Sequence, residues 1–211
     1  MLSYRKLAMR VLGRPLHTGG GIDSPRPASQ RAAALVLTAA LLTGAAFPAF
    51  ADTYYIENGD ITISAGESGN DVTQNNVTTK NDTNTIITNS DKDTASSHTV
   101  TIDAGNDKVE VTLKDVNIKA DSGSALASKG DVTLTLKGDN HLTGGISDNG
   151  SYGLSGISSS GSLTISGGET DSLTAQGGSG TDGSGGRGII STKSVTISGG
   201  TVNATGGSSG S

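Results

Sequence analysis

The sequence predicts an all-β protein, a single-stranded parallel β-helix of about four coils, and it does so through two observations. First, a unit of three short strands recurs with anchor residues Val132, Leu163 and Val195, which lie 31 and 32 residues apart. Apolar and polar residues alternate after each anchor, as in a half-buried strand. Second, the copies differ in length mainly in one Gly/Ser-rich corner. Strands that stay in register while one corner varies are typical of coils stacked about 4.8 Å apart.

Residues 1–51 differ from the rest of the chain and have the order of a secretory signal peptide. Residues 1–31 form an extended basic segment, residues 32–47 an apolar run, and Ala49 and Ala51 place small residues before a cleavage site after Ala51. The alternative is a membrane anchor, but sixteen residues fall short of the roughly 20 that a spanning helix needs. We therefore expect export from a bacterial cell, to a secreted, extracellular or cell-surface location, with no stable transmembrane segment after cleavage.

The composition of the remaining chain excludes several classes of protein. Residues 52–211 carry nineteen acidic and nine basic residues, so their net charge is near −10. A nucleic-acid partner is excluded on this basis, because phosphates require a basic face. The chain has no cysteine, so disulfides cannot hold it together, and residues 52–211 contain no Trp or Phe. The lack of Trp disfavours a stacking platform for neutral sugars.

Residues 52–97 precede the repeats and have a mixed character. The stretch "TYYIENGDITISA" has strand character, and a cap over the first coil is plausible for it. The stretch "TQNNVTTKNDTNTIITNSDKDTASS" is weakly apolar, which indicates a flexible polar segment or an edge. We therefore expect a strand or cap followed by a flexible segment.

Residues 98–211 are expected to form the coils. The segments "HTVTIDAG" and "KVEVTLKDVNIKA" fit the same scheme as the three later copies. A disordered linker is the alternative, but a linker does not keep apolar residues in register. The aligned copies also place serines in one column, where we expect a hydroxyl ladder: Ser128, Ser159 and Ser191.

The last copy is expected to leave an open edge. After the strand 195–197, no further coil follows that could pair with it. Such an edge invites pairing with another chain, so edge-to-edge self-association is expected. We also expect the sequence to be an N-terminal piece of a longer protein, incomplete at its C-terminal end, or to need a partner there.

Three acidic residues in the Gly/Ser-rich corners are candidate metal ligands: Asp121, Asp148 and Asp182. An Asp next to Gly and hydroxyl residues can offer carboxylate and carbonyl oxygens to a hard cation such as calcium. The alternative is ordinary turn chemistry, since Asp-Gly and Asp-Asn are common in loops.

Three basic residues near the same corners are candidate ligands for a polysaccharide: Lys129, Arg187 and Lys193. They could pair with uronate carboxylates, Arg187 through a bidentate contact. The alternative is that they are solubilising side chains on turns.

No motif points to catalysis. His98 and His141 are isolated in the sequence, and the chain has no nucleophile elbow, no HExxH zinc motif and no phosphate-binding loop. We therefore expect a protein that is not an enzyme.

The repeats resemble those of bacterial surface proteins that contain a carbohydrate-binding domain, within the pectate-lyase-like parallel β-helix superfamily. The resemblance covers about residues 97–211 and rests on the style of the repeat; the segments that carry it are "VTIDAG", "VEVTLKDVNIKA", "LASKGDVTLTLKGDNHLTGG", "LTISGGETDSLTAQGG" and "VTISGGTVNATGG". It implies a right-handed β-helix, calcium in some members, and binding of acidic polysaccharides such as polygalacturonate.

The sequence and the resemblance together predict a secreted or cell-surface, non-catalytic protein that binds carbohydrate, acidic rather than neutral, with calcium as the candidate cofactor. The second hypothesis is a fragment of an adhesin or autotransporter passenger with a structural display role. The third is an acidic-polysaccharide lyase.

Overall fold

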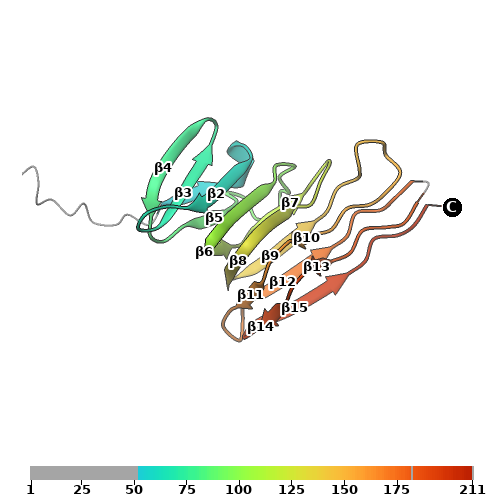
Figure 1. Cartoon of the computed structure of the whole chain (residues 1–211). Helices are drawn as coiled ribbons and strands as arrows, with labels where there is room; N and C mark the ends of the chain where they lie inside the picture. The colour runs from blue at the N-terminus through green and yellow to red at the C-terminus, as the bar shows by residue number, and fades with distance from the viewer. Residues whose placement is uncertain (1–51, 182, 211) are drawn as a thin grey trace, which may run out of the picture. The chain divides into compact units, whose positions relative to one another are not determined.

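A computed structural model describes residues 52–181 and 183–210, so the expected signal peptide lies outside the described residues. The described part is all-β with mostly parallel pairing, and one short 3-10 turn, η1 (Ile56–Asn58), is its only helical element (Figure 1). No helix in the described part of the chain is long and apolar enough to cross a membrane. The strands are β1 (Thr53–Tyr55), β2 (Ile61–Ala65), β3 (Asn70–Gln74), β4 (Val77–Asp82), β5 (Ile86–Thr88), β6 (Val100–Lys114), β7 (Asn117–Lys119), β8 (Leu126–Lys137), β9 (Asp139–Thr143), β10 (Ile157–Ser159), β11 (Leu163–Ser166), β12 (Ser172–Gln176), β13 (Ile189–Ser191), β14 (Val195–Ile197) and β15 (Thr201–Thr205).

The strands of successive repeats pair in three columns. The first column contains β2, β6, β8, β10 and β13, and the second contains β1, β5, β6, β8, β11 and β14. The long strands β6 and β8 belong to both columns, because their first halves pair in one and their second halves in the other. The third column contains β7, β9, β12 and β15. Every pairing within these columns is parallel, which confirms the expected stacking of repeats.

The register confirms the sequence alignment for two of the three strands of a repeat. In the second column Val132 lies opposite Leu163, and Leu163 lies opposite Val195. In the third strand the first leucines of the two repeats do not face each other. Leu142 lies opposite Ala175, and Leu173 lies opposite Asn140. Asn140 is fully buried, and its side chain bonds the backbone of three neighbouring segments, so a polar residue occupies an inward position there.

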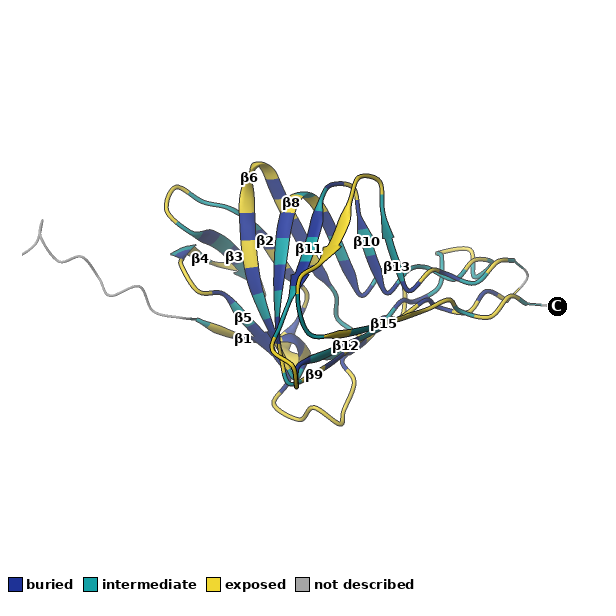
Figure 2. Cartoon of the chain, turned by 90° about the horizontal axis from the view of Figure 1, so that it is seen from below, coloured by how far each residue is buried: buried dark blue, intermediate teal, exposed yellow. Residues whose placement is uncertain are grey.

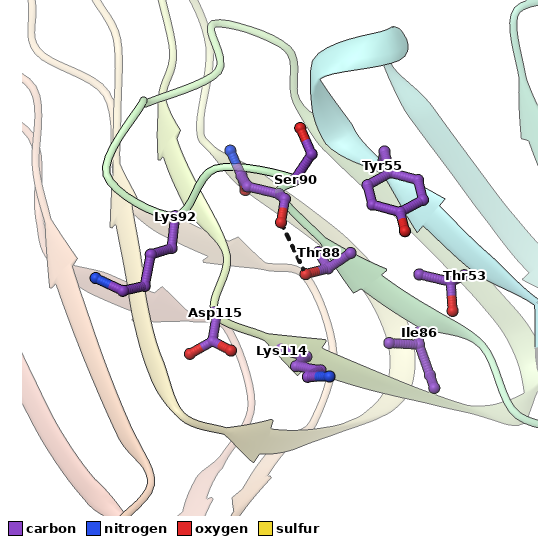
Figure 3. Close-up of a pocket in the computed structure, with 9 residues that line it drawn as sticks. Thr53, Tyr55, Ile86, Thr88, Ser90, Lys92, Lys114 and Asp115 are labelled. Carbon is purple, nitrogen blue, oxygen red and sulfur yellow. Dashed lines mark hydrogen bonds between the residues drawn. The ribbon is translucent and has the colours of Figure 1, made fainter.

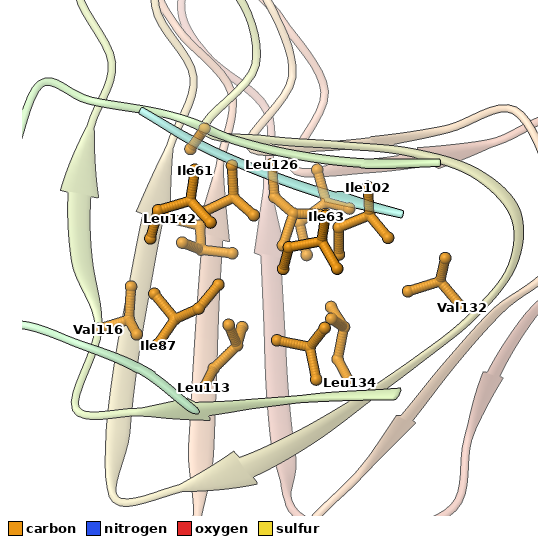
Figure 4. Packing of buried hydrophobic residues seen from close by; sticks show 14 of the residues in the cluster. Ile61, Ile63, Ile87, Ile102, Leu113, Val116, Leu126, Val132, Leu134 and Leu142 are labelled. Carbon is orange, nitrogen blue, oxygen red and sulfur yellow. The ribbon is translucent and has the colours of Figure 1, made fainter. Parts of the chain in front are cut away.

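The core is a continuous stack of small aliphatic side chains. The inward positions of the columns carry Ile, Leu, Val and Ala, nearly all of them under 3% exposed (Figure 4). Each like residue packs on its counterpart in the next repeat, for example Leu134 on Ile165. Full burial of such a side chain contributes about 1.5–3 kcal/mol to the free energy of unfolding. Most of this burial comes from stacking between repeats.

The serine column forms, but its hydroxyls bond to the backbone, so the expected hydroxyl ladder is wrong. Ser159 Oγ donates to the Gly161 carbonyl at 3.2 Å, and Ser191 Oγ donates to the same carbonyl at 2.7 Å. Ser128 Oγ is buried and has no hydrogen-bond partner among the described residues. Ser159 and Ser191 thus both bond to the Gly161 carbonyl, in the corner between the first and second columns.

Residues 70–82 form a hairpin at the N-terminal end of the stack, and residues 73–82 of it were expected in a flexible polar segment or an edge. Strands β3 and β4 pair antiparallel, and β3 pairs antiparallel with β2. Asn75 and Asn76 connect them with φ angles of 53° and 62°, the backbone that a tight two-residue hairpin requires. The hairpin covers the free edge of β2, as expected of a cap.

The Gly/Ser-rich corners stack into an ordered arm. We define the glycine arm as residues 144–156, 177–181, 183–188 and 206–210. Its segments are joined by backbone hydrogen bonds, including Gly178 N to Leu154 O at 2.7 Å and Gly207 N to Gly186 O at 2.8 Å, and it extends beyond the strands (Figure 2). A Cβ atom on Gly178 would lie 1.9 Å from the Gly145 carbonyl oxygen, so only glycine permits this approach. Glycine also recurs at every third position from 177 to 186, the period of polyproline II.

Candidate functional site

A groove of about 500 Å³ opens at the N-terminal end of the second column. We call it the β1–β5–β6 groove (Figure 3). Its lining combines one aromatic ring, two lysines, one carboxylate and several hydroxyl or amide groups; the residues are Thr53, Tyr55, Ile86, Thr88, Asn89, Ser90, Lys92, Lys114 and Asp115.

Strand alternation explains why these side chains reach the surface. Tyr54, Ile87 and Leu113 point into the core and are at most 9% exposed. Their neighbours Tyr55 and Lys114 therefore point outward. Thr88, between them, is only 9% exposed, and its hydroxyl donates to the Asn89 carbonyl at 3.2 Å. The parallel register places Tyr55 opposite Thr88, and Thr88 opposite Lys114, so one row across three strands carries a phenol, a hydroxyl and an ammonium group.

A loop after β5 forms one wall of the groove and is held by its own hydrogen bonds. The Asn89 side chain donates to the carbonyls of Thr94 and Asn117, both at 3.1 Å, and accepts from the Asn117 N–H at 2.8 Å. Glu57 accepts hydrogen bonds from the Ser90 backbone N–H, at 2.9 Å, and from the Ser90 hydroxyl. Desolvation opposes ionisation of Glu57, but the bonds from Ser90 outweigh it and lower its pKa. The wall is thus shaped before any ligand arrives.

The lysines differ in how far they are engaged. Lys92 Nζ pairs with Oδ1 of the adjacent Asp93 at 2.7 Å, and both side chains are more than half exposed. Such surface pairs contribute little. Lys114 has no ion pair with any residue in the described ranges, and it lies in register with Lys137, which contacts Asp171 at 3.5 Å. The groove therefore offers ammonium groups that can bind an anion.

The outward face of the second column continues from the groove as a regular array of hydroxyls. Thr133, Thr164 and Thr196 lie in register on β8, β11 and β14. Beside them, Thr135 Oγ1 and Ser166 Oγ lie 3.4 Å apart. We call this array the hydroxyl face. A polymer that leaves the groove along the stack would meet hydroxyl groups about every 4.8 Å.

Two of the three predicted metal ligands, Asp121 and Asp148, lie on corners in or beside the glycine arm. Asp121 is exposed, and its carbonyl accepts from the Ile146 N–H at 3.3 Å. Asp148 is exposed in a turn in which Gly150 N donates to Ser147 O at 2.7 Å. Asp182 lies outside the described residues. The described ranges hold no group of three His, Cys, Asp or Glu side chains that could bind a metal ion.

The three predicted polysaccharide ligands lie along the first column rather than in the groove. Lys129 Nζ contacts Asp103 Oδ2 at 3.2 Å. The Gly105 N–H and then Lys129 lower the pKa of Asp103. Arg187 precedes β13 and Lys193 follows it, so the strand separates these two exposed cations.

Sequence reasoning missed the groove, although a signal was present. "TYYI" places Thr53 and Tyr55 at alternate positions, whereas "TIIT" shows no alternation. Both segments fall in the part assigned to a cap and a flexible segment. His98 Nδ1 lies 3.3 Å from Asp60 Oδ1, and both side chains are largely exposed. His141 lies on β9, in the third column, so the described structure does not bring the two histidines together with the groove.

Comparison with known proteins adds no assignment. No family model, no curated protein and no solved structure matches the chain.

Proposed function

We propose that this is a secreted or cell-surface, non-catalytic protein that binds acidic polysaccharide in the β1–β5–β6 groove. The observation that carries the proposal is the row of Tyr55, Thr88 and Lys114 across three strands. Lys114 supplies a cation for a uronate carboxylate, and charge-assisted hydrogen bonds of this kind are the strong ones. Tyr55, 42% exposed, offers a ring face to a sugar, and the exposed Thr53 offers a hydroxyl.

The overall negative charge supports a local and selective contact. An acidic polymer is repelled by most of a chain with a net charge near −10 and is attracted only where cations gather. Lys92 and Lys114 line the same groove, and Lys137 neighbours Lys114 in register. The hydroxyl face then accommodates the continuation of the polymer along the stack.

The architecture that we propose is a right-handed parallel β-helix. Three parallel columns with one strand of each repeat in each column support it. The handedness follows from a general rule, since connections between parallel strands of one sheet are right-handed in about 98% of cases.

Calcium is part of the proposal as an aid to binding. Asp121 and Asp148 supply carboxylate oxygens, the ligand type that calcium prefers. Because two carboxylates do not fill six to eight coordination positions, carboxylates of the polysaccharide would contribute the remaining oxygens. No step of the binding at Lys114 depends on this ion.

Binding measurements with polygalacturonate test the proposal. We expect titration calorimetry to detect binding of polygalacturonate and none of a neutral polymer such as dextran, and chelator to weaken it. Lys114→Ala should weaken binding by about tenfold or more, as expected for a lost charged hydrogen bond. Lys119→Ala removes an exposed lysine from β7 in the third column and should have no effect. If Lys114→Ala and Lys119→Ala bind polygalacturonate with equal affinity, the groove is not the binding site. If no binding is detected at all, the proposed function is wrong.

A structural display role is the second candidate, favoured by the glycine arm. Tyr152 is 54% exposed on this arm, and a rigid stack that presents an exposed aromatic residue suits an adhesin. Adhesion of cells that display the chain, lost on deletion of residues 147–152 while polygalacturonate binding remains, would favour this role. A lyase, the third hypothesis, would release unsaturated products that absorb in the ultraviolet, and we expect none.

A further inference from the structure

The outward side of the second column presents its hydroxyl groups in two straight rows. One row lies across β8, β11 and β14, and the other lies beside it across β6, β8 and β11; their members are Thr133, Thr164 and Thr196, and Thr112, Thr135 and Ser166. Among these pairings of described strands, the register shifts only between Asp103 and Lys108, before the rows begin. The rows therefore cross successive repeats without a break, and Thr112 adds β6 to the hydroxyl face.

The two rows form a lattice with fixed dimensions. Parallel strands lie about 4.8 Å apart, and alternate residues along one strand lie about 6.6 Å apart. Leu134 and Ile165, the inward residues between the rows, are 0% exposed and anchor their strands in the core. The branched β-carbon of threonine restricts its χ1 angle, which limits the orientations of its hydroxyl and methyl groups. The hydroxyl oxygens are thus ordered before any ligand arrives.

Most of these hydroxyl groups have no partner within the protein. Across the ranges that the structure describes, the hydroxyls of Thr112, Thr133 and Thr164 make no hydrogen bond with another residue, and all three side chains are partly exposed. Thr135 Oγ1 and Ser166 Oγ are 3.4 Å apart, which is long for a bond between two hydroxyls. The face therefore hydrogen-bonds with solvent, or with a ligand that lies on it.

The fold itself does not require hydroxyl residues at outward positions. The third column has the same alternation, and its outward positions carry unlike residues, among them Asp139, His141, Gln176 and Asn203. From β8 to β14, by contrast, the two rows of the hydroxyl face contain no charged and no aromatic residue. Glu110, opposite Thr133, and Lys137, at the end of β8, lie at the border of the array. The face thus suits an uncharged ligand, and it lacks the aromatic ring on which a neutral sugar stacks.

We propose that the hydroxyl face binds ice, a function separate from the binding of polysaccharide in the groove. A polymer chain repeats in one dimension, whereas the hydroxyl face repeats in two. Ice is an uncharged lattice of hydrogen-bonding oxygens that repeats in two dimensions on each crystal face, and the oxygen rows of its prism faces repeat at a distance close to the strand spacing. Water molecules bonded to the hydroxyls therefore lie near lattice positions and bridge the protein to the crystal. Because the face is ordered in advance, little conformational entropy is lost on binding.

Partition of the full chain and of its secreted form into slowly grown ice tests the proposal. The wild type should enter the ice, whereas a protein that does not bind ice remains in the liquid. Thr164→Lys places a long charged side chain in the centre of the array and should abolish most of the incorporation. Thr174→Lys makes the same change on β12 of the same repeat, on the outward side of the third column, and should behave as the wild type does.

A second variant and a second readout keep the test independent of folding. Thr196→Lys changes an exposed residue of β14, so it should fold, and it should also reduce incorporation into ice. The melting temperature shows whether each variant is folded. Ice crystals that grow slowly in the presence of the wild type should develop facets, because bound protein stops growth on one set of faces, and they should stay round with Thr164→Lys.

The outcomes separate this proposal from the proposed function of the groove. Exclusion of the wild type from ice overturns ice binding, as does equal incorporation of folded Thr164→Lys and Thr174→Lys. Short galacturonate oligomers should bind all of these variants with the affinity of the wild type, because the groove is unchanged. If Thr164→Lys loses oligomer binding and still enters ice, the face contacts the polymer and the proposal is wrong. If no variant binds galacturonate, the function of the groove is wrong, while incorporation of the wild type into ice still confirms the hydroxyl face as an ice-binding surface.

Discussion

Ile165 and Ile197 are isoleucines at equivalent positions of adjacent repeats. They differ in packing, since strands lie on both sides of Ile165 and on one side of Ile197. They are paired in register on β11 and β14, and their exposures are 0% and 53%. Replacing each with alanine therefore measures how much of the stability comes from stacking between repeats. The change in chemistry is identical in the two variants, so differences in the unfolded state largely cancel.

The expected magnitudes follow from burial. Ile165→Ala removes a fully enclosed side chain and leaves a cavity between β8 and β14, which costs about 2–5 kcal/mol. At Ile197 about half of the side chain is already in solvent and no closed cavity forms, so the loss should be about 1 kcal/mol or less. For a chain of this size, 1 kcal/mol shifts the melting temperature by about 2–4 °C. Ile165→Ala should therefore lower it by roughly 4–20 °C, and Ile197→Ala by only a few degrees.

Urea unfolding followed by circular dichroism is the assay. Repeat proteins can unfold repeat by repeat, so the amide exchange of β11 and β14 should be followed in parallel. Equal losses of stability in the two variants would refute the idea that neighbouring repeats supply the stability of each strand.

Two further perturbations test separate parts of the fold. Gly178→Ala should loosen the glycine arm and raise amide exchange there, because its Cβ would lie 1.9 Å from the Gly145 carbonyl oxygen, whereas Gly206→Ala, whose nearest neighbour lies at 3.5 Å, should be tolerated; equal effects of the two substitutions would contradict the close packing. Asp171 accepts hydrogen bonds from the N–H groups of Gly168 and Gly138, and these bonds hold its pKa below the ordinary value. Its contribution to stability is therefore complete above about pH 4 and is lost as pH falls through the lowered pKa. A stability curve that falls less steeply below pH 4 in Asp171→Asn than in the wild type is the expected result, and identical curves would exclude the role.

The columns of the fold could be predicted from the sequence because their signal is local and repeated. Alternation after Val132, Leu163 and Val195 gives both the strands and their register, and the structure reproduces it. The third strand was harder to align, since a buried asparagine takes an inward position at Asn140. Nothing apolar marks that position in the sequence, and two of its backbone partners, Val116 and Ser172, lie in the neighbouring repeats.

The groove and the glycine arm could not be predicted in the same way. The groove depends on β1 pairing with β5, and β5 with β6, and both β1 and β5 are only three residues long, too short for an alternating pattern to mark them. The arm has almost no apolar residues, and its order comes from backbone hydrogen bonds between segments that look like low-complexity sequence. Patterns of side chains carry little information where the backbone makes the contacts.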